Sequence, residues 1–278
     1  MSMSKVSIIL HSGLGNQLFM LFTGISKAID EKKDFNFYPV YQNPRGFYFT
    51  NILKAIAYKQ EESPTSLQSR PGYEEPFFHY SPIPRDAQVI KGYFQSPKYF
   101  NHNKDEIIRI LGLDKFFPRY ELGYKAIAIH LRLGDKTIDQ HVHTLLRPSY
   151  FINSINHLLE IIPNVENDYK FLIFAEKDDE PLVNDYLDEF REKVNKKIDF
   201  IKFYEIMPNL KDYEELLYMS SCNHFIIGNS SYSWFAAYLS RNEGKNVWYP
   251  DDWFNQYVRK EKLIKDLVMD NWSNWHKK

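Results

Sequence analysis

The stretch that decides the fold is KAIAIHLRLGD, residues 125–135. Its first seven residues are mostly apolar and include β-branched side chains, a composition typical of a buried strand, and a polar turn follows them. Similar short apolar runs lie further along the chain, at residues 171–174, 198–203, 225–227 and 246–249. The second half of the chain therefore predicts several short strands.

Segments with helical spacing separate these strands, at residues 149–162, 180–194, 212–219 and 231–240. Strands that alternate regularly with helices predict a parallel sheet covered on both faces. Residues 251–269 are expected to form a terminal helical stretch.

The first half of the chain opens in the same way, with a strand at residues 6–10, a turn and a helix from 16 to about 29. Between residues 35 and 91, seven prolines and many aromatic residues interrupt the pattern, which predicts loops and short irregular elements on a smaller α/β domain. A helix at 105–113 and a linker at 112–123 are expected to complete this half.

We therefore expect two α/β domains, residues 1–118 and 119–255, and a terminal helix within 256–278 that packs back across them. Ligands of open α/β sheets bind outside the carboxyl ends of the strands, so two such domains would form a cleft between these ends.

Composition excludes several classes of protein. The 278 residues include 35 Lys plus Arg and 36 Asp plus Glu, a net charge of −1 that offers no global field for nucleic acid or anionic lipid. Hydrophobic residues make up 44% and charged residues 26%, as in soluble globular domains. The apolar run at 6–10 is far shorter than the ~20 residues of a membrane span, and no signal peptide is apparent, so we expect a cytoplasmic protein with no integral membrane segment. The single cysteine, Cys222, excludes an intrachain disulfide and is expected to be buried and inert.

The first candidate site is the turn HSGLGNQ, residues 11–17. Gly13 and Gly15 allow a tight turn whose backbone N–H groups lie at the positive end of the following helix, where they suit a phosphate or a sugar hydroxyl. The alternative is an ordinary strand-to-helix turn in which Asn16 is the N-cap.

The second candidate site surrounds Arg132, which follows the strand ending at residue 131. Its guanidinium is always charged and its donors match phosphate oxygens. His130 is two positions away and so faces the same side, and Asp135 is placed to hold one of the two. The alternative is an Arg–Asp ion pair that only fixes the loop.

The third candidate site is GNSSYSWF, residues 228–235, again a strand end that turns into a helix. Hydroxyl groups and free N–H groups at a helix start can hold an anion, unless the serines merely cap the helix. The residues concerned are Asn229, Ser230, Ser231, Tyr232 and Ser233.

Together, one Arg and two helix starts describe a diphosphate site that needs no metal. The acidic run at 178–180 precedes a predicted helix, where acidic residues favour the helix dipole. Asp139, His141 and His143 lie in a polar loop and are expected to be solvated. No metal site is therefore predicted.

At this point the motifs GLGNQLF (13–19), IHLRLGD (129–135) and GNSSYSW (228–234) resemble those of the α-1,2-fucosyltransferases. The resemblance covers nearly the whole chain and includes GYFQS (92–96) and YMSSC (218–222). It implies a GT-B fold, GDP-β-L-fucose as the donor, and transfer with inversion, without a metal or other cofactor, to the 2-hydroxyl of a galactose-terminated oligosaccharide or glycan.

By the same resemblance, Arg132 would bind the GDP diphosphate and stabilise it as it leaves, and His130 would help to place the nucleotide. Residues 230–233 would cradle phosphate, and Asn16 would lie near the reacting centre. Asp135 and His11 are both candidates for a general base. The sequence departs from the family pattern at Leu133, where a second Arg is usual, at His11, where glycine is common, and across 174–179, where Ser-Asp-Asp is usual.

Three other interpretations remain open. The first is a GT-B transferase with another nucleotide sugar or acceptor, such as a protein O-fucosyltransferase. The second is a non-catalytic protein that binds a nucleotide sugar or glycan. The third is a metallohydrolase that uses His130, Asp135, His141 and His143. The aromatic, proline-interrupted region between 35 and 91 is expected to shape the acceptor subsite.

Overall fold

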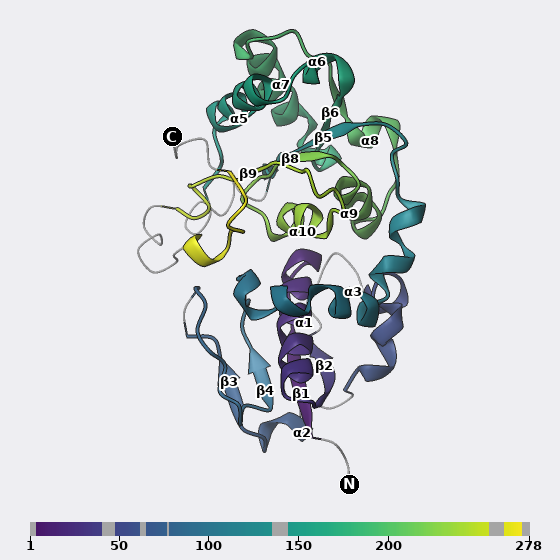
Figure 1. Cartoon of the computed structure of the whole chain (residues 1–278), viewed down its shortest axis with the longest axis vertical. Helices are drawn as coiled ribbons and strands as arrows, with labels where there is room; N and C mark the ends of the chain where they lie inside the picture. The colour runs from purple at the N-terminus through teal and green to yellow at the C-terminus, as the bar shows by residue number, and fades with distance from the viewer. Residues whose placement is uncertain are drawn as a thin grey trace. The chain divides into compact units, whose positions relative to one another are not determined.

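The computed structural model describes residues 4–40, 48–61, 65–76, 78–134, 144–255 and 264–273. The chain forms two compact units, Met1–Arg119 with Glu261–Met269 and Tyr120–Lys260 with Asp270–Lys278. Each unit is α/β with an all-parallel sheet, which confirms the expected fold class (Figure 1).

The second unit contains a five-stranded sheet of order β7-β6-β5-β8-β9. Its strands are β5 (Ala126–His130), β6 (Lys170–Phe174), β7 (Phe200–Lys202), β8 (His224–Ile226) and β9 (Val247–Trp248). Its helices are α5 (Pro148–Ile161), α6 (Val165–Asp168), α7 (Glu180–Lys193), α8 (Phe203–Ile206), α9 (Asp212–Ser220) and α10 (Ser231–Leu239). The predicted alternation of strand and helix is therefore confirmed, with ends shifted by a few residues.

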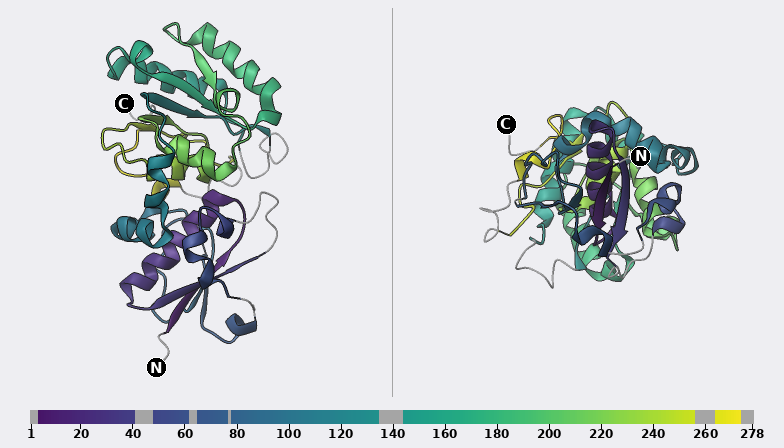
Figure 2. Two further views of the ribbon diagram at one scale, coloured as in Figure 1. Left: turned by 90° about the vertical axis from the view of Figure 1, so that its right-hand side faces the viewer. Right: turned by 90° about the horizontal axis from the view of Figure 1, so that it is seen from below.

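The central strand β5 is buried along its whole length, which explains its apolar sequence. Ile127 and Ile129 point into a core cluster that includes residues of α5 and α7. Side chains alternate along a strand, so Ala128 and His130 point to the opposite face. That face is covered by α9 and α10, as Figures 1 and 2 show.

The first unit contains a four-stranded sheet of order β2-β1-β4-β3. Its strands are β1 (Lys5–Leu10), β2 (Asp34–Pro39), β3 (Gly72–Glu74) and β4 (Val89–Lys91), and its helices are α1 (Leu14–Asp30), α2 (Thr65–Gln68) and α3 (Lys104–Leu111). The expectation of only irregular structure between residues 35 and 91 was wrong, because this region supplies three of the four strands.

Helix α1 packs closely on strand β1. A Cβ added at Gly24 would lie 2.2 Å from Cγ1 of Ile8, so only glycine allows this approach without a shift. The helix begins two residues earlier than predicted.

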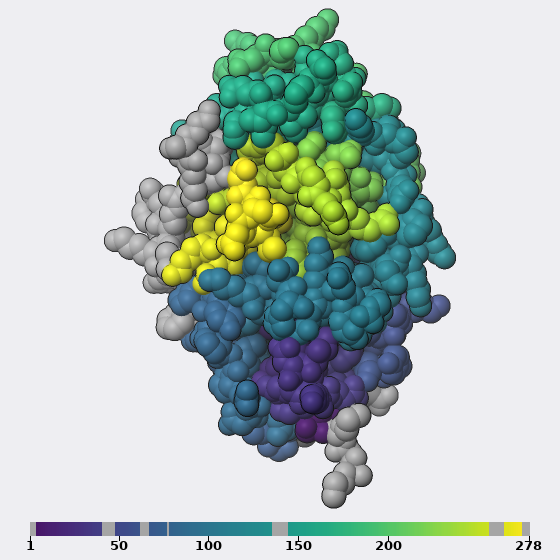
Figure 3. All heavy atoms as spheres, viewed as in Figure 1, coloured from purple at the N-terminus to yellow at the C-terminus, as the bar shows by residue number. Residues whose placement is uncertain are grey.

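The expectation of a terminal helix was wrong for the described residues. Residues 251–255 are not helical, and the only helical turn in 264–273 is the 3-10 turn Ile264–Asp266. In this turn Asp266 accepts a hydrogen bond from the backbone N–H of Tyr80 and forms an ion pair with Lys98. Residues 264–269 belong to the first unit, and Figure 3 shows their yellow surface against the blue surface of the same unit. Residues 256–263 and 274–278 lie outside the described part of the chain.

Within the described ranges, no helix combines the length and the apolar character that crossing a membrane requires.

Candidate functional site

The carboxyl ends of β5 and β8 bring together three residues that the sequence singled out. The two strands are parallel neighbours, so their ends lie at the same edge of the sheet. A Cβ added at Gly228 would lie 3.4 Å from Nδ1 of His130 and 3.8 Å from Cβ of Arg132. The second and third sequence motifs therefore meet in one place within the second unit.

Arg132 makes an ion pair at this edge that the sequence analysis did not predict. Its Nη1 lies 3.0 Å from Oε1 of Glu176, and the Glu176 side chain is 49% exposed. The Arg132 side chain is only 19% exposed, so solvent screens the glutamate side of this pair more than the arginine side. Asp135, the predicted partner, lies outside the described residues.

The start of helix α10 faces His130, whose ring centroid lies 5.8 Å from that of Tyr232. Ser230 is the N-cap and accepts the backbone N–H of Tyr232 at 3.3 Å, while the Ser233 hydroxyl donates to the carbonyl of Ser230 at 3.3 Å. Two of the three serine hydroxyls therefore support the helix itself. The hydroxyl of Ser231 has no hydrogen-bond partner among the described residues.

The buried side chain of Asn229 joins two other loops by hydrogen bonds. It is 1% exposed, and its side-chain amide donates to the carbonyls of Thr144 at 2.7 Å and Trp253 at 3.2 Å. These bonds fix the turn before α10, so Asn229 shapes the edge while its side-chain N–H groups are already engaged.

Glu215 on α9 is an acidic group near this edge that the sequence analysis missed. Burial raises its pKa to about 7, nearby Glu176 and Asp212 raise it further, and a hydrogen bond from the Tyr232 hydroxyl opposes the shift. No motif singled it out, because its proximity to the site arises from the packing of α9 on α10.

Leu133 is 1% exposed and belongs to the apolar cluster of this unit. The position where the fucosyltransferase pattern has a second Arg therefore points into the core here. Arg132 is the motif's only arginine.

A second cluster of predicted residues lies in the first unit, after strand β1. The Nδ1 of His11 lies 3.0 Å from the Ser12 hydroxyl, and Oδ1 of Asn16 accepts a hydrogen bond from Gln95 at 2.7 Å. Burial lowers the pKa of His11, and Lys91 lowers it further, so this imidazole is neutral at pH 7. Gln95 had appeared only as part of a motif, and its contact with Asn16 joins residues 79 positions apart.

The turn itself differs from the sequence expectation. Gly13 is the N-cap of α1 and has an ordinary φ of −74°, and Gly15 lies inside the helix. Ser12 takes the left-handed conformation instead, with φ of +64°. Asn16 is therefore not the N-cap, and its side chain is available to interact with Gln95.

Gly13→Ala separates a structural role of this glycine from a binding role. A Cβ at Gly13 would have no heavy atom within 4 Å, so we expect the melting temperature to stay within about 2 °C of the wild type. If a substrate approaches the backbone here, sugar transfer will fall while stability holds. Unchanged stability with unchanged transfer would show that Gly13 contacts no substrate, and calorimetry with a transfer assay distinguishes these results.

The other titratable residues that the sequence singled out are buried, fix a loop or lie outside the described residues. Cys222 is fully buried, as expected, and burial raises the pKa of its thiol. Asp179 accepts the backbone N–H of Gly134 at 2.8 Å and so fixes the loop after β5. No group of three His, Cys, Asp or Glu side chains suited to a metal occurs in the described part of the chain, and Asp139, His141 and His143 lie outside it.

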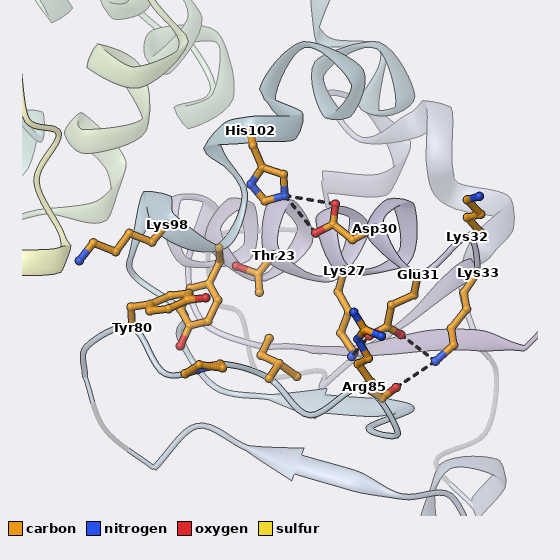
Figure 4. Close-up of a pocket in the computed structure, with 13 residues that line it drawn as sticks. Thr23, Lys27, Asp30, Glu31, Lys32, Lys33, Tyr80, Arg85, Lys98 and His102 are labelled. Carbon is orange, nitrogen blue, oxygen red and sulfur yellow. Dashed lines mark hydrogen bonds and ion pairs between the residues drawn. The ribbon is translucent and has the colours of Figure 1, made fainter.

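A cavity of about 570 Å³ lies along the second half of α1 in the first unit (Figure 4). Lys27 and Lys33 both bond to Glu31, and His102 pairs with Asp30 at 3.0 Å. Cations at a helix C-terminus favour its dipole, which explains the lysines without a ligand. None of the predicted site residues lines this cavity.

Comparison with known proteins agrees with the motifs. A model described as Glycosyl transferase family 11 matches residues 71–274. This chain therefore belongs to glycosyl transferase family 11, and it is a glycosyltransferase of the fucosyltransferase type.

Two curated relatives come from Escherichia coli. One is named Alpha-1,2-colitosyltransferase and is 24% identical over 97% of this chain and 98% of its own length. The other is named O-antigen biosynthesis glycosyltransferase WbnK and is 26% identical over 53% of this chain and 43% of its own length.

Similar solved structures include the fucosyltransferase NodZ from Bradyrhizobium, with 12% identity and a TM-score of 0.46 over 86% of this chain and 94% of that one. They also include a mutant of FUT1 from Arabidopsis thaliana in complex with GDP, with 13% identity and a TM-score of 0.47 over 90% of this chain and 71% of that one.

Proposed function

We propose that this protein transfers L-fucose from GDP-β-L-fucose to the 2-hydroxyl of a galactoside, with inversion and without a metal. The observation that carries the proposal is the grouping of His130, Arg132 and the start of α10 at one edge of the second unit's sheet. Family membership supplies the reaction class, and this edge supplies the groups suited to a nucleoside diphosphate.

The chemistry of the donor explains these residue types. In a single displacement at the anomeric carbon, negative charge grows on the departing diphosphate. Fixed donors aimed at that charge stabilise the transition state more than the ground state. We assign this role to the guanidinium of Arg132, which would exchange Glu176 for phosphate oxygens. The hydroxyl of Ser231 and the first N–H groups of α10 are assigned the remaining contacts.

The acceptor is assigned to residues of the first unit. The neutral imidazole of His11 can accept a proton from a sugar hydroxyl, and Asn16 can orient that hydroxyl by hydrogen bonding. Asp135 remains the other candidate base. A transition state with oxocarbenium character and a good leaving group needs little help from a base.

A colitosyl donor is the second candidate, because a relative that aligns with 97% of this chain is named an α-1,2-colitosyltransferase. Colitose is L-fucose without its 3-hydroxyl. The two donors would therefore differ by one polar contact in the sugar pocket. The groups assigned to the diphosphate do not distinguish between the two sugars.

The test is incubation of the purified protein with single donors and a galactoside panel, followed by linkage analysis of the product. We expect transfer from GDP-fucose or GDP-colitose and an α-1,2 linkage, with activity preserved in excess EDTA. Transfer only from UDP-sugars would overturn the donor assignment. Activity abolished by EDTA and restored by manganese would overturn the metal-free mechanism. GDP binding without transfer or donor hydrolysis would indicate a non-catalytic binding protein.

A further inference from the structure

Three parallel strands of the first unit end at one edge of its sheet. Strand β1 pairs with β4, and β4 pairs with β3, all in parallel. His11 and Asn16 follow β1, Glu75 follows β3, and the segment 92–96 follows β4. Residues that are distant in sequence therefore meet beside the proposed acceptor residues.

The carboxylate of Glu75 holds the segment after β4. Its Oε2 accepts the backbone N–H of Tyr93 at 2.8 Å and that of Phe94 at 2.9 Å. The backbone N–H of Glu75 in turn donates to the carbonyl of Lys91 at 2.8 Å. One half-buried side chain therefore ties two neighbouring strand ends together.

The backbone of this segment has unusual φ angles, and the Glu75 side chain fills the space that a side chain at Gly92 would need. A Cβ added at Gly92 would lie 2.4 Å from Cβ of Glu75, and the φ of +157° at Gly92 is one that other residues rarely adopt. Phe94 has φ of +50° and a fully buried side chain. Such a conformation at a non-glycine residue costs free energy and persists only where surrounding contacts enforce it.

The held segment reaches the residues assigned to the acceptor. The ring of Tyr93 meets the ring of His11 edge-on, with centroids 4.8 Å apart. The side-chain amide of Gln95 donates to Oδ1 of Asn16 at 2.7 Å. Each of the two acceptor-side residues is thus contacted by the segment whose backbone Glu75 binds.

We propose that Glu75 is a positioning residue for sugar transfer: through Tyr93 and Gln95 it fixes the orientation of His11 and Asn16. The role rests on the proposed function of those two residues. Glu75 itself touches no substrate in this account, and it acts through the backbone of the segment after β4.

The ionisation of Glu75 is consistent with a functional role. Burial raises the pKa of its carboxyl to about 7, although the two backbone N–H groups favour the ionised form. A half-buried carboxylate is a costly way to hold a loop, because a charged group loses more hydration free energy on burial than a neutral amide does. Charge-assisted hydrogen bonds are also stronger than neutral ones, so the ionised form holds the segment more firmly.

The test compares Glu75→Ala and Glu75→Gln with Glu74→Gln. Glu74 is the neighbouring residue, its side chain is 70% exposed, and it forms an ion pair with Lys91 at 2.9 Å. It is therefore a matched control for the loss of one carboxylate at this strand end.

Two measurements are needed, and the first does not depend on activity. Amide hydrogen exchange at Tyr93 and Phe94 should become about tenfold faster or more in Glu75→Ala, because both N–H groups lose their acceptor. Glu75→Gln retains a carbonyl oxygen and should show a smaller increase, and Glu74→Gln should show none. If amide exchange at Tyr93 and Phe94 is unchanged in Glu75→Ala, their hydrogen bonds to Glu75 are refuted, and the proposal with them.

The second measurement is the kcat of transfer to a galactoside, alongside the Kd of GDP. Glu75→Ala should lower kcat on the order of tenfold to a hundredfold, as expected for small misplacements of reacting groups, while GDP binds as in the wild type. Glu75→Gln should recover part of kcat. Faster exchange with wild-type kcat would reduce Glu75 to a merely structural residue and overturn the proposal. If the wild type transfers no sugar from any donor, the proposed function fails, and the exchange result still decides whether Glu75 holds the segment.

Discussion

Arg132→Ala should lower kcat/KM for sugar transfer by about a hundredfold to a thousandfold. The expected size follows from the loss of one preorganised donor to a developing anion, which costs about 3–4 kcal/mol in other enzymes. The reason for so large an effect here is that Leu133, the position of the usual second Arg, is buried in the core. Steady-state kinetics with GDP-fucose and a galactoside measure it.

The matched control for this substitution is Arg241→Ala. Arg241 also pairs with one glutamate, Glu121, at 2.6 Å, and both side chains are more than half exposed. We expect its kcat/KM to remain within about twofold of the wild type, since an exposed surface ion pair contributes little. Near-full activity in Arg132→Ala, or an equal loss in both variants, would refute the assignment of Arg132.

Gly228→Ala should both destabilise the protein and reduce transfer. The new Cβ would lie 2.9 Å from the backbone carbonyl oxygen of His130, and neither strand end can give way without moving the other. Overpacking of this kind costs about 1–3 kcal/mol. The displaced end of β5 carries Arg132, so we also expect transfer to fall by at least about tenfold. Thermal unfolding and the transfer assay measure the two effects.

Gly244→Ala provides the comparison, because its Cβ would meet nothing closer than 3.7 Å. Its melting temperature and activity should match those of the wild type. A Gly228→Ala protein with wild-type stability and transfer would show that the ends of β5 and β8 are not fixed as described.

The second unit was the more predictable part of the fold. Strand β5 and its parallel neighbours are buried on both faces, so each appears in the sequence as a continuous apolar run. In the first unit, β3 and β4 have three residues each and carry exposed positions. Such short strands leave no periodic signal, and they are specified by their pairing, β4 with β1 and β3 with β4, rather than by their own sequence.

The candidate site was predictable to the extent that it follows strand ends. His130 and Arg132 could be placed beside Gly228 because parallel strands share an edge. The hydrogen bonds of Asn229 could not be predicted, since its partners Thr144 and Trp253 lie in loops 85 and 24 positions away. The contacts of Glu75 and Gln95 arise in the same way, from strand ends that the sequence pattern did not mark.

The central claim is that Arg132 and the start of α10 bind a nucleotide through its diphosphate. The most direct test is isothermal titration calorimetry, which measures the affinities of the wild type and Arg132→Ala for GDP and for GMP. We predict that the wild type binds GDP at least about tenfold more tightly than GMP and that Arg132→Ala loses this preference while remaining folded. Equal affinity of the wild type for GDP and GMP, or a preference that survives in the variant, would contradict it.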